Sequence, residues 1–200
     1  MKTEKIRVNA CGDGMEQALN QTEKAGLHCG LTKKEVLRLR LLSEELFGLL
    51  RTIAGEAEAV YWVESRQKSF SLHLRTELAM TRRTYMELID VSTDGKNAAA
   101  TGLMGNIKNM ITVTLLPHEP KPSQNIYGMI RHDEDENDQV GSYSWSMKRY
   151  LAELERNSEQ DGDAAYTLRE LEKSIVANLS DEVTVRVVGS CAEITIDKAF

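Results

Sequence analysis

The sequence predicts an α+β fold, a two-layer sandwich in which helices cover one face of a mostly antiparallel sheet. Its central element is a long amphipathic helix that includes residues 39–53. At about 100° per residue, six apolar side chains fall on one face of this helix. They are Leu39, Leu42, Leu46, Leu49, Leu50 and Ile53. The chain also lacks repeated strand–helix–strand units and ends in an alternating hairpin pattern, and both observations favour an antiparallel sheet.

The first part of the chain carries the signals for one strand and two helices. Residues 4–9 alternate as in a short strand. A helix is predicted over residues 14–28, with Asp13 as its N-terminal cap. Thr32 and Glu35 have the spacing of a capping box, so we expect the long helix to begin there.

The remaining elements are predicted from alternation and from helical periodicity. One hairpin is predicted from strands at residues 59–64 and 70–76, and a second from strands at residues 183–188 and 192–197. Three further helices are predicted: one that begins at Thr81, one over residues 143–156 and one over residues 166–179. All three prolines and an acidic run lie within residues 117–141, which we interpret as a mobile stretch. The domain prediction is therefore a single domain over residues 1–200, with an insertion at 117–163.

The composition excludes several classes of protein. The net charge of −6 argues against a general nucleic-acid binder, which would present a basic face. The three cysteines are widely spaced, so free thiols are expected rather than a disulfide framework, and no metal site is predicted. The chain start does not resemble a signal peptide, and no run approaches the roughly 20 apolar residues of a membrane helix. We expect a cytoplasmic protein with no membrane partner.

Glu45 is the first candidate functional residue, because it lies at the border of the apolar face of the long helix. A carboxylate there costs free energy unless another group pairs with it. One interpretation is a general base or a carboxylate that orients water. The other is a structural carboxylate paired with Arg38 or another cation. The sequence leaves both open.

A stretch of small polar residues and glycines at 92–105 is the second candidate. Backbone N–H groups beside small side chains can approach a phosphate closely, and the dipole of the helix that follows favours the anion. The alternative is a flexible turn, because Asp-Gly is a common turn pair. The candidate residues are Asp94, Gly95, Lys96, Asn97, Gly102 and Gly105.

The order of elements resembles the GHKL ATPase superfamily, in particular the histidine-kinase-type ATPase domain and the anti-sigma-factor serine kinases. The resemblance covers most of residues 4–116 and 166–200 and implies the histidine-kinase-like ATPase fold. That family carries Glu-x-x-x-Asn on its long helix, where Glu acts on the attacking group and Asn holds Mg²⁺. Glu45 and Leu49 occupy these positions here. Leucine has no oxygen with which to bind Mg²⁺.

The resemblance also assigns roles to the glycine-bearing stretch. Asp94 and Gly95 match part of the family's Asp-x-Gly-x-Gly motif for adenine, and Gly102 and Gly105 match its phosphate-binding glycines. It therefore implies a degenerate pocket for ATP or ADP, with no Mg²⁺ expected.

The leading hypothesis is a regulatory ATP-binding-like protein without catalytic activity, a pseudoenzyme. Any activity would be that of an ATPase or a serine-protein kinase. The alternative is a non-catalytic module that resembles an anti-sigma factor and binds a regulatory protein partner but no nucleotide. In that case the terminal hairpin, residues 183–197, is the predicted contact surface.

Overall fold

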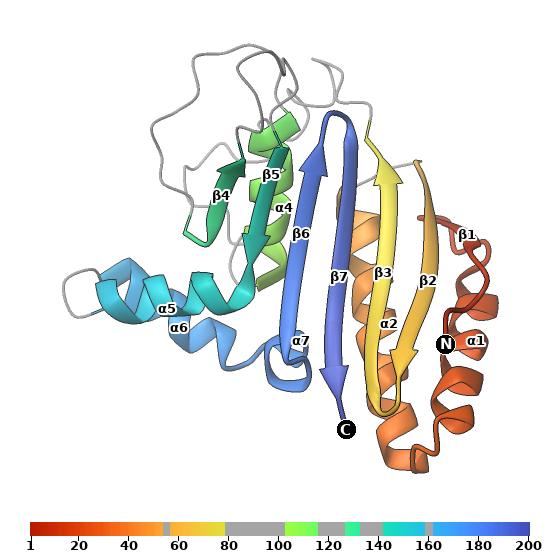
Figure 1. Cartoon of the computed structure of the whole chain (residues 1–200). Coiled ribbons are helices and arrows are strands. Elements are labelled where there is room, and N and C mark those ends of the chain that lie inside the picture. The colour runs from red at the N-terminus through yellow and green to blue at the C-terminus, as the bar shows by residue number, and fades with distance from the viewer. Residues whose placement is uncertain (54–56, 79–102, 116–126, 133–141, 159–161) are drawn as a thin grey trace.

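The computed structural model describes residues 1–53, 57–78, 103–115, 127–132, 142–158 and 162–200, which combine helices with an antiparallel sheet (Figure 1). The α+β class is therefore confirmed. The helix predicted to begin at Thr81 lies outside the described residues. The strands are β1 (Ile6–Asn9), β2 (Glu58–Arg66), β3 (Ser69–Glu77), β4 (Met129–His132), β5 (Ser142–Ser146), β6 (Glu182–Val188) and β7 (Cys191–Ala199). The helices are α1 (Met15–His28), α2 (Lys33–Ile53), α4 (Leu103–Leu115), α5 (Met147–Asn157), α6 (Gly162–Leu171) and α7 (Ile175–Leu179).

The described strands form one seven-stranded sheet in the order β1-β2-β3-β7-β6-β5-β4, and every neighbouring pair is antiparallel. Both predicted hairpins are present, and their strands are longer than predicted. They meet in the middle of the sheet, where β3 pairs with β7 and Leu72 lies opposite Ile196. Because β6 and β7 both have neighbours on either side, the terminal hairpin offers no free edge. Within the described sheet, the free edges belong to β1 and β4.

The beginnings of the two N-terminal helices differ in their capping. The capping box of α2 is confirmed, because the Thr32 N–H donates to Glu35 Oε2 (2.6 Å) and the Glu35 N–H donates to Thr32 Oγ1 (3.4 Å). The prediction that Asp13 caps α1 is wrong. Gly14 occupies the cap position without a side-chain cap, and the Asp13 carboxylate instead accepts from Asn9 Nδ2 (2.8 Å). None of the described helices is both long and apolar enough to cross a membrane.

The core lies between the sheet and the helices behind it in Figure 1, where α2 passes behind β3 and β7. A buried hydroxyl cluster joins α1, α2 and β2: the Tyr61 hydroxyl lies 2.7 Å from Thr22 Oγ1 and 2.9 Å from Ser43 Oγ. Burial raises the pKa of Tyr61 to about 12. The opposite face of the sheet carries polar residues and an aromatic stack, in which the rings of Trp62 and His73 are 4.7 Å apart.

The helix predicted over residues 143–156 begins later than expected. Residues 142–146 form β5, in which Trp145 lies opposite Val185 of β6. The alternation of Tyr143 and Trp145 with serines fits a strand, whereas the prediction followed the helical spacing of the apolar residues beyond Trp145.

The helix predicted over residues 166–179 is also interrupted. α6 ends at Leu171 and α7 begins at Ile175. Ser174 separates them as an N-terminal cap, because its Oγ accepts a hydrogen bond from the Ala177 N–H (3.3 Å).

Parts of the predicted insertion belong to the sheet and the core. The Trp145 Nε1–H donates to the Tyr127 carbonyl (3.0 Å), and the Gly128 N–H donates to Glu153 Oε2 (2.7 Å). Gly128 has φ 81°, and a Cβ there would come within 2.8 Å of Trp145 Nε1 and of Tyr150 Cβ. Only a glycine fits this corner, at which β4 and α5 meet.

Candidate functional site

Glu45 lies on the flank of α2 that faces away from α1. The flank toward α1 is marked by Arg40, whose Nη1 lies 2.7 Å from Glu23 Oε1, and by Arg51, whose Nη2 lies 3.3 Å from Met15 Sδ. Helical geometry places Glu45 roughly 120–140° around the axis from both arginines. α2 also contacts α4, which lies on the side of α2 opposite α1 in Figure 1. The Glu45 side chain therefore lies on the α4 side.

Within the part of the chain that the structure describes, the half-buried Glu45 carboxylate has no hydrogen-bond or ion-pair partner. Arg38 precedes it by about two helical turns, a rise of roughly 10 Å, and does not reach it. The next carboxylate, Glu44, is paired with Arg40 (Nε–Oε1 2.9 Å). Burial, and then the negative charge of Glu44, raise the pKa of Glu45. Carboxylates with a perturbed pKa occur at functional sites and also in purely structural settings, so Glu45 is a candidate.

Replacement of Glu45 tests whether this carboxylate stabilises the fold. A carboxyl group with a raised pKa binds its proton more tightly in the folded chain, so its contribution to stability falls as the pH rises through its unfolded pKa toward its folded pKa. Glu45→Gln should therefore raise the Tm at neutral pH and flatten the decline of Tm above acidic pH, measured by circular dichroism.

Glu44→Gln is the matched control for this measurement. It removes an acceptor of Arg40, so it should leave the Tm unchanged or lower it slightly. A lower Tm in Glu45→Gln would contradict the prediction and indicate that Glu45 has a structural role.

Leu49 lies one turn after Glu45, and its side chain is only 2% exposed. It packs in the core with the other apolar residues of α2. The position at which the resemblance to the GHKL family would place a metal-binding Asn is thus occupied by a core side chain. No group of three or more His, Cys, Asp or Glu side chains in the described ranges is arranged to hold a metal ion.

One candidate residue of the predicted glycine stretch, Gly105, lies in α4. Gly105 is buried in the first turn of α4, and no acidic residue lies in that turn. The next residue, Asn106, hydrogen-bonds the hydroxyl of Tyr150 on α5, and burial raises the pKa of Tyr150 to about 12. The first turn of α4 therefore contains no carboxylate that would compete with an anionic ligand for the positive end of the helix dipole.

The other predicted loop residues, Asp94, Gly95, Lys96, Asn97 and Gly102, lie outside the described residues, as does the acidic run at 133–138. Three residues of the predicted site lie among the described residues: Glu45 and Leu49 on α2, and Gly105 on α4. The structure places these two helices in contact.

Gly48 is a residue of this flank that the sequence analysis did not select. It follows Glu45 by roughly 60° around the helix axis. A glycine inside a helix costs about 0.5–1 kcal/mol relative to alanine, so its presence needs a reason. Gly26 has one, because a Cβ there would lie 3.2 Å from Val36 Cγ2, whereas a Cβ at Gly48 meets no atom of the described residues within 4 Å. The sequence contains a signal for this position, because Gly48 is a glycine in the middle of a helix whose other residues favour the helical conformation.

Among the described residues, the flank of α2 beside α4 therefore combines a half-buried carboxylate without a partner and a glycine at which the position of a Cβ is open. Such a surface can receive a polar ligand, whose hydrogen bonds would satisfy Glu45. The chain matches no protein-family model and no curated protein.

Proposed function

We propose that this protein is a cytoplasmic regulatory protein with the two-layer sandwich fold of the histidine-kinase-type ATPases and a degenerate adenine-nucleotide pocket. The observation that carries the proposal is the Glu45 carboxylate on the α4 side of α2, which has no partner among the described residues. The order of a strand, a long helix, a hairpin, a glycine-preceded helix and a terminal hairpin supports it.

In the proposed complex, the nucleotide phosphates lie at the N-terminal turn of α4, where backbone N–H groups and the helix dipole favour an anion. The ribose or a bridging water bonds Glu45, and the lack of a side chain at Gly48 leaves room for it.

Mg²⁺ would have no side-chain oxygen ligand at Leu49. Charge that develops on the γ-phosphate in the transition state would therefore remain uncompensated, and phosphoryl transfer would be very slow. The expected function is nucleotide sensing without turnover.

Isothermal titration with ATP and ADP, each with and without Mg²⁺, tests this proposal. We expect binding that Mg²⁺ changes by less than about threefold, no hydrolysis, and little effect of Glu45→Gln. Gly48→Ala should weaken binding while raising the Tm of the free protein, since alanine favours the helix by about 0.5–1 kcal/mol. Leu49→Asn supplies the missing oxygen and should make binding depend on Mg²⁺, provided that circular dichroism shows this variant is folded.

Robust Mg²⁺-dependent ATP turnover that is lost in Glu45→Gln would contradict the proposal in favour of an active kinase or ATPase. Absence of binding of both nucleotides at millimolar concentration would favour the alternative, a protein-interaction module. The burial of Leu49 is the observation that favours this alternative, because a core side chain lies where the resemblance would place a metal-binding Asn.

A further inference from the structure

The face of the sheet opposite the core carries a histidine whose ring is almost enclosed. The His73 side chain on β3 is 15% exposed, and its ring stacks on that of Trp62 on β2, with 4° between the ring planes. His73 Nδ1 lies 3.1 Å from Thr195 Oγ1 and 3.6 Å from Glu193 Oε1. Its Nε2 is buried and has no hydrogen-bond partner among the described residues. Because both nitrogens of a protonated imidazole are donors, protonation leaves a charged N–H at Nε2 without an acceptor.

Two ammonium groups lie on the other side of the Trp62 ring. Lys2 Nζ is 5.5 Å and Lys5 Nζ is 4.8 Å from the ring centroid, within the range of cation–π attraction. Both lysines belong to residues 1–5, here called the N-terminal segment, which runs along the side of β2 away from β3. Trp62, which is 5% exposed, is therefore held between these two cations and the His73 ring. A positive charge on His73 would place a third cation around one ring, and like charges repel.

Glu64 connects the two sides of this cluster. Its Oε1 lies 2.8 Å from the Lys2 ammonium and accepts a hydrogen bond from the Trp62 Nε1–H (3.0 Å). These bonds lower the pKa of Glu64, so it stays ionised over the range in which a histidine changes charge. Burial lowers the pKa of His73, and the negative charge of Glu64 is the largest influence that opposes this. Glu64 is therefore the carboxylate for which a protonated His73 would compete with Lys2.

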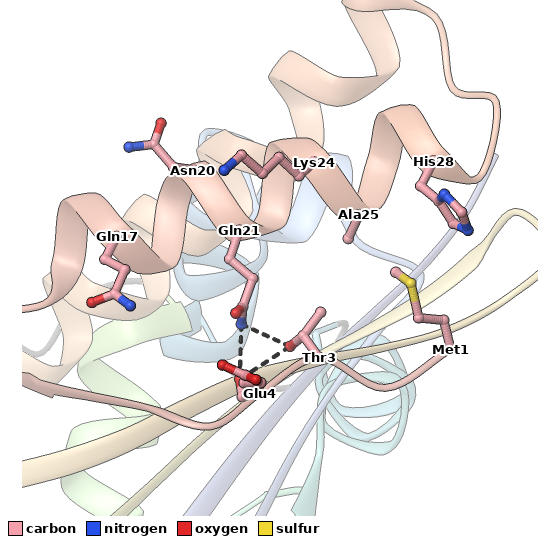
Figure 2. A pocket seen from close by; sticks show the side chains of 9 residues that line it. All are labelled: Met1, Thr3, Glu4, Gln17, Asn20, Gln21, Lys24, Ala25 and His28. Carbon is pink, nitrogen blue, oxygen red and sulfur yellow. Dashed lines mark hydrogen bonds between the residues drawn. The ribbon is translucent and has the colours of Figure 1, made fainter.

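The N-terminal segment is the part of this cluster that can leave without opening the core. Its backbone bonds β2 at Met1 and at Thr3, whose N–H donates to the Val63 carbonyl (2.9 Å). On its other side, Gln21 Nε2 of α1 donates to Thr3 Oγ1 (2.8 Å), as Figure 2 shows. No side chain of residues 1–5 is buried. β2 and β3, in contrast, pair with strands on both sides and contribute to the core.

We propose that protonation of His73 releases the N-terminal segment from β2, so that this cluster acts as a pH-sensitive switch. The imidazolium draws Glu64 toward its Nε2–H and repels Lys2 and Lys5 across the Trp62 ring, which removes the contacts that hold both lysines. In the released state His73 is hydrated and takes up its proton more readily, so acid favours release.

The charged groups around His73 come from each neighbouring element. They are Lys2 and Lys5 of the N-terminal segment, Glu64 of β2, Arg75 of β3, and Glu193 and Asp197 of β7. Release would also open the groove of about 780 Å³ between the segment and α1, because the segment forms one of its walls (Figure 2). The switch is independent of the proposed nucleotide pocket, which lies on the other side of the sheet.

An NMR titration of the ¹³C- and ¹⁵N-labelled protein tests the switch. It starts at about pH 8 and is continued downward until the His73 Cε1–H signal has shifted fully. As His73 takes up its proton, the backbone order parameters of Thr3 and Lys5 should fall from about 0.85 to below about 0.6, whereas those of Leu72 and Leu74 on β3 stay high. The midpoint of this loss should coincide with the midpoint of the His73 signal.

Two pairs of variants identify the groups responsible. His73→Gln is uncharged at every pH and should keep the segment ordered throughout the titration. His28→Gln removes the histidine that lines the groove near Met1 and should leave the release intact. Lys2→Gln removes a repelling charge and frees Glu64, so it should raise the pKa of His73. Lys24→Gln makes the same change in net charge on α1 and should leave that pKa unchanged.

The proposal is overturned if Thr3 and Lys5 stay ordered once His73 is protonated, or if His73→Gln releases the segment at the same pH. Loss of order in β3 together with the segment would also contradict it, because protonation would then unfold the sheet rather than release one segment. An unchanged His73 pKa in Lys2→Gln would show that the segment and His73 are not coupled, and this measurement does not depend on the folding of His73→Gln.

Discussion

Trp145→Ala should lower the free energy of unfolding by about 3–5 kcal/mol, the range for removal of a large buried aromatic side chain. The Trp145 side chain is 1% exposed, its ring centroid lies 5.6 Å from that of Tyr150, and its Nε1–H donates to the Tyr127 carbonyl. The substitution leaves a cavity between β5 and α5 and an unsatisfied carbonyl. Urea denaturation followed by circular dichroism measures the loss.

Trp145→Phe separates the two contributions. It keeps most of the ring volume and loses the N–H group, so its cost should be about 0.5–1.5 kcal/mol for the hydrogen bond plus a smaller packing loss. A wild-type unfolding curve for Trp145→Ala would contradict the prediction. It would mean that β4, β5 and α5 lie outside the cooperative unit, as expected for an insertion at 117–163.

The sequence predicted the elements whose patterns are local. The terminal hairpin could be predicted because β6 and β7 each have one buried and one polar face, which gives strict alternation. The capping box at Thr32 and Glu35 is likewise a signal within a single turn, and the structure confirms it.

One wrong prediction depends on a partner distant in the sequence, and the other depends on competition within a single turn. Residues 142–146 become a strand because Tyr143 and Trp145 pair with Val187 and Val185 of β6, and no local pattern reveals that partner. Asp13 has the residue type of a cap, but Asn9 holds its carboxylate, and Gly14 takes the cap position in a left-handed conformation.

The candidate site shows the same division. Periodicity predicted that Glu45 borders the apolar face and that Leu49 is buried, and the structure agrees on both residues. Periodicity could not predict which neighbouring helix faces Glu45, because that depends on the packing of α1 and α4 on either side of α2. The absence of a partner for Glu45 among the described residues follows from this packing.

Leu46→Ala should lower the free energy of unfolding by about 2–5 kcal/mol, since removal of a buried leucine costs both the transfer free energy and the cavity that remains. The Leu46 side chain is fully buried on the face of α2 that belongs to the core. Leu37→Ala is the matched control, because it makes the same change on the same helix at a side chain that is 56% exposed. Its cost should be below about 0.5 kcal/mol, as for most surface substitutions.

The same pair of variants relates the fold to the candidate site. Leu46 and Glu45 are adjacent in sequence but point about 100° apart on the helix, so Leu46→Ala should destabilise the protein without changing the surface on which Glu45 lies. Below its melting temperature, the variant should therefore retain the nucleotide affinity that we propose for the parent, measured by titration calorimetry. If Leu46→Ala melted like the wild type and Leu37→Ala lost stability, the buried face of α2 would be the one that carries Leu37. Glu45 would then border a different surface, and the assignment of the α4 side as the ligand-binding flank would fail with it.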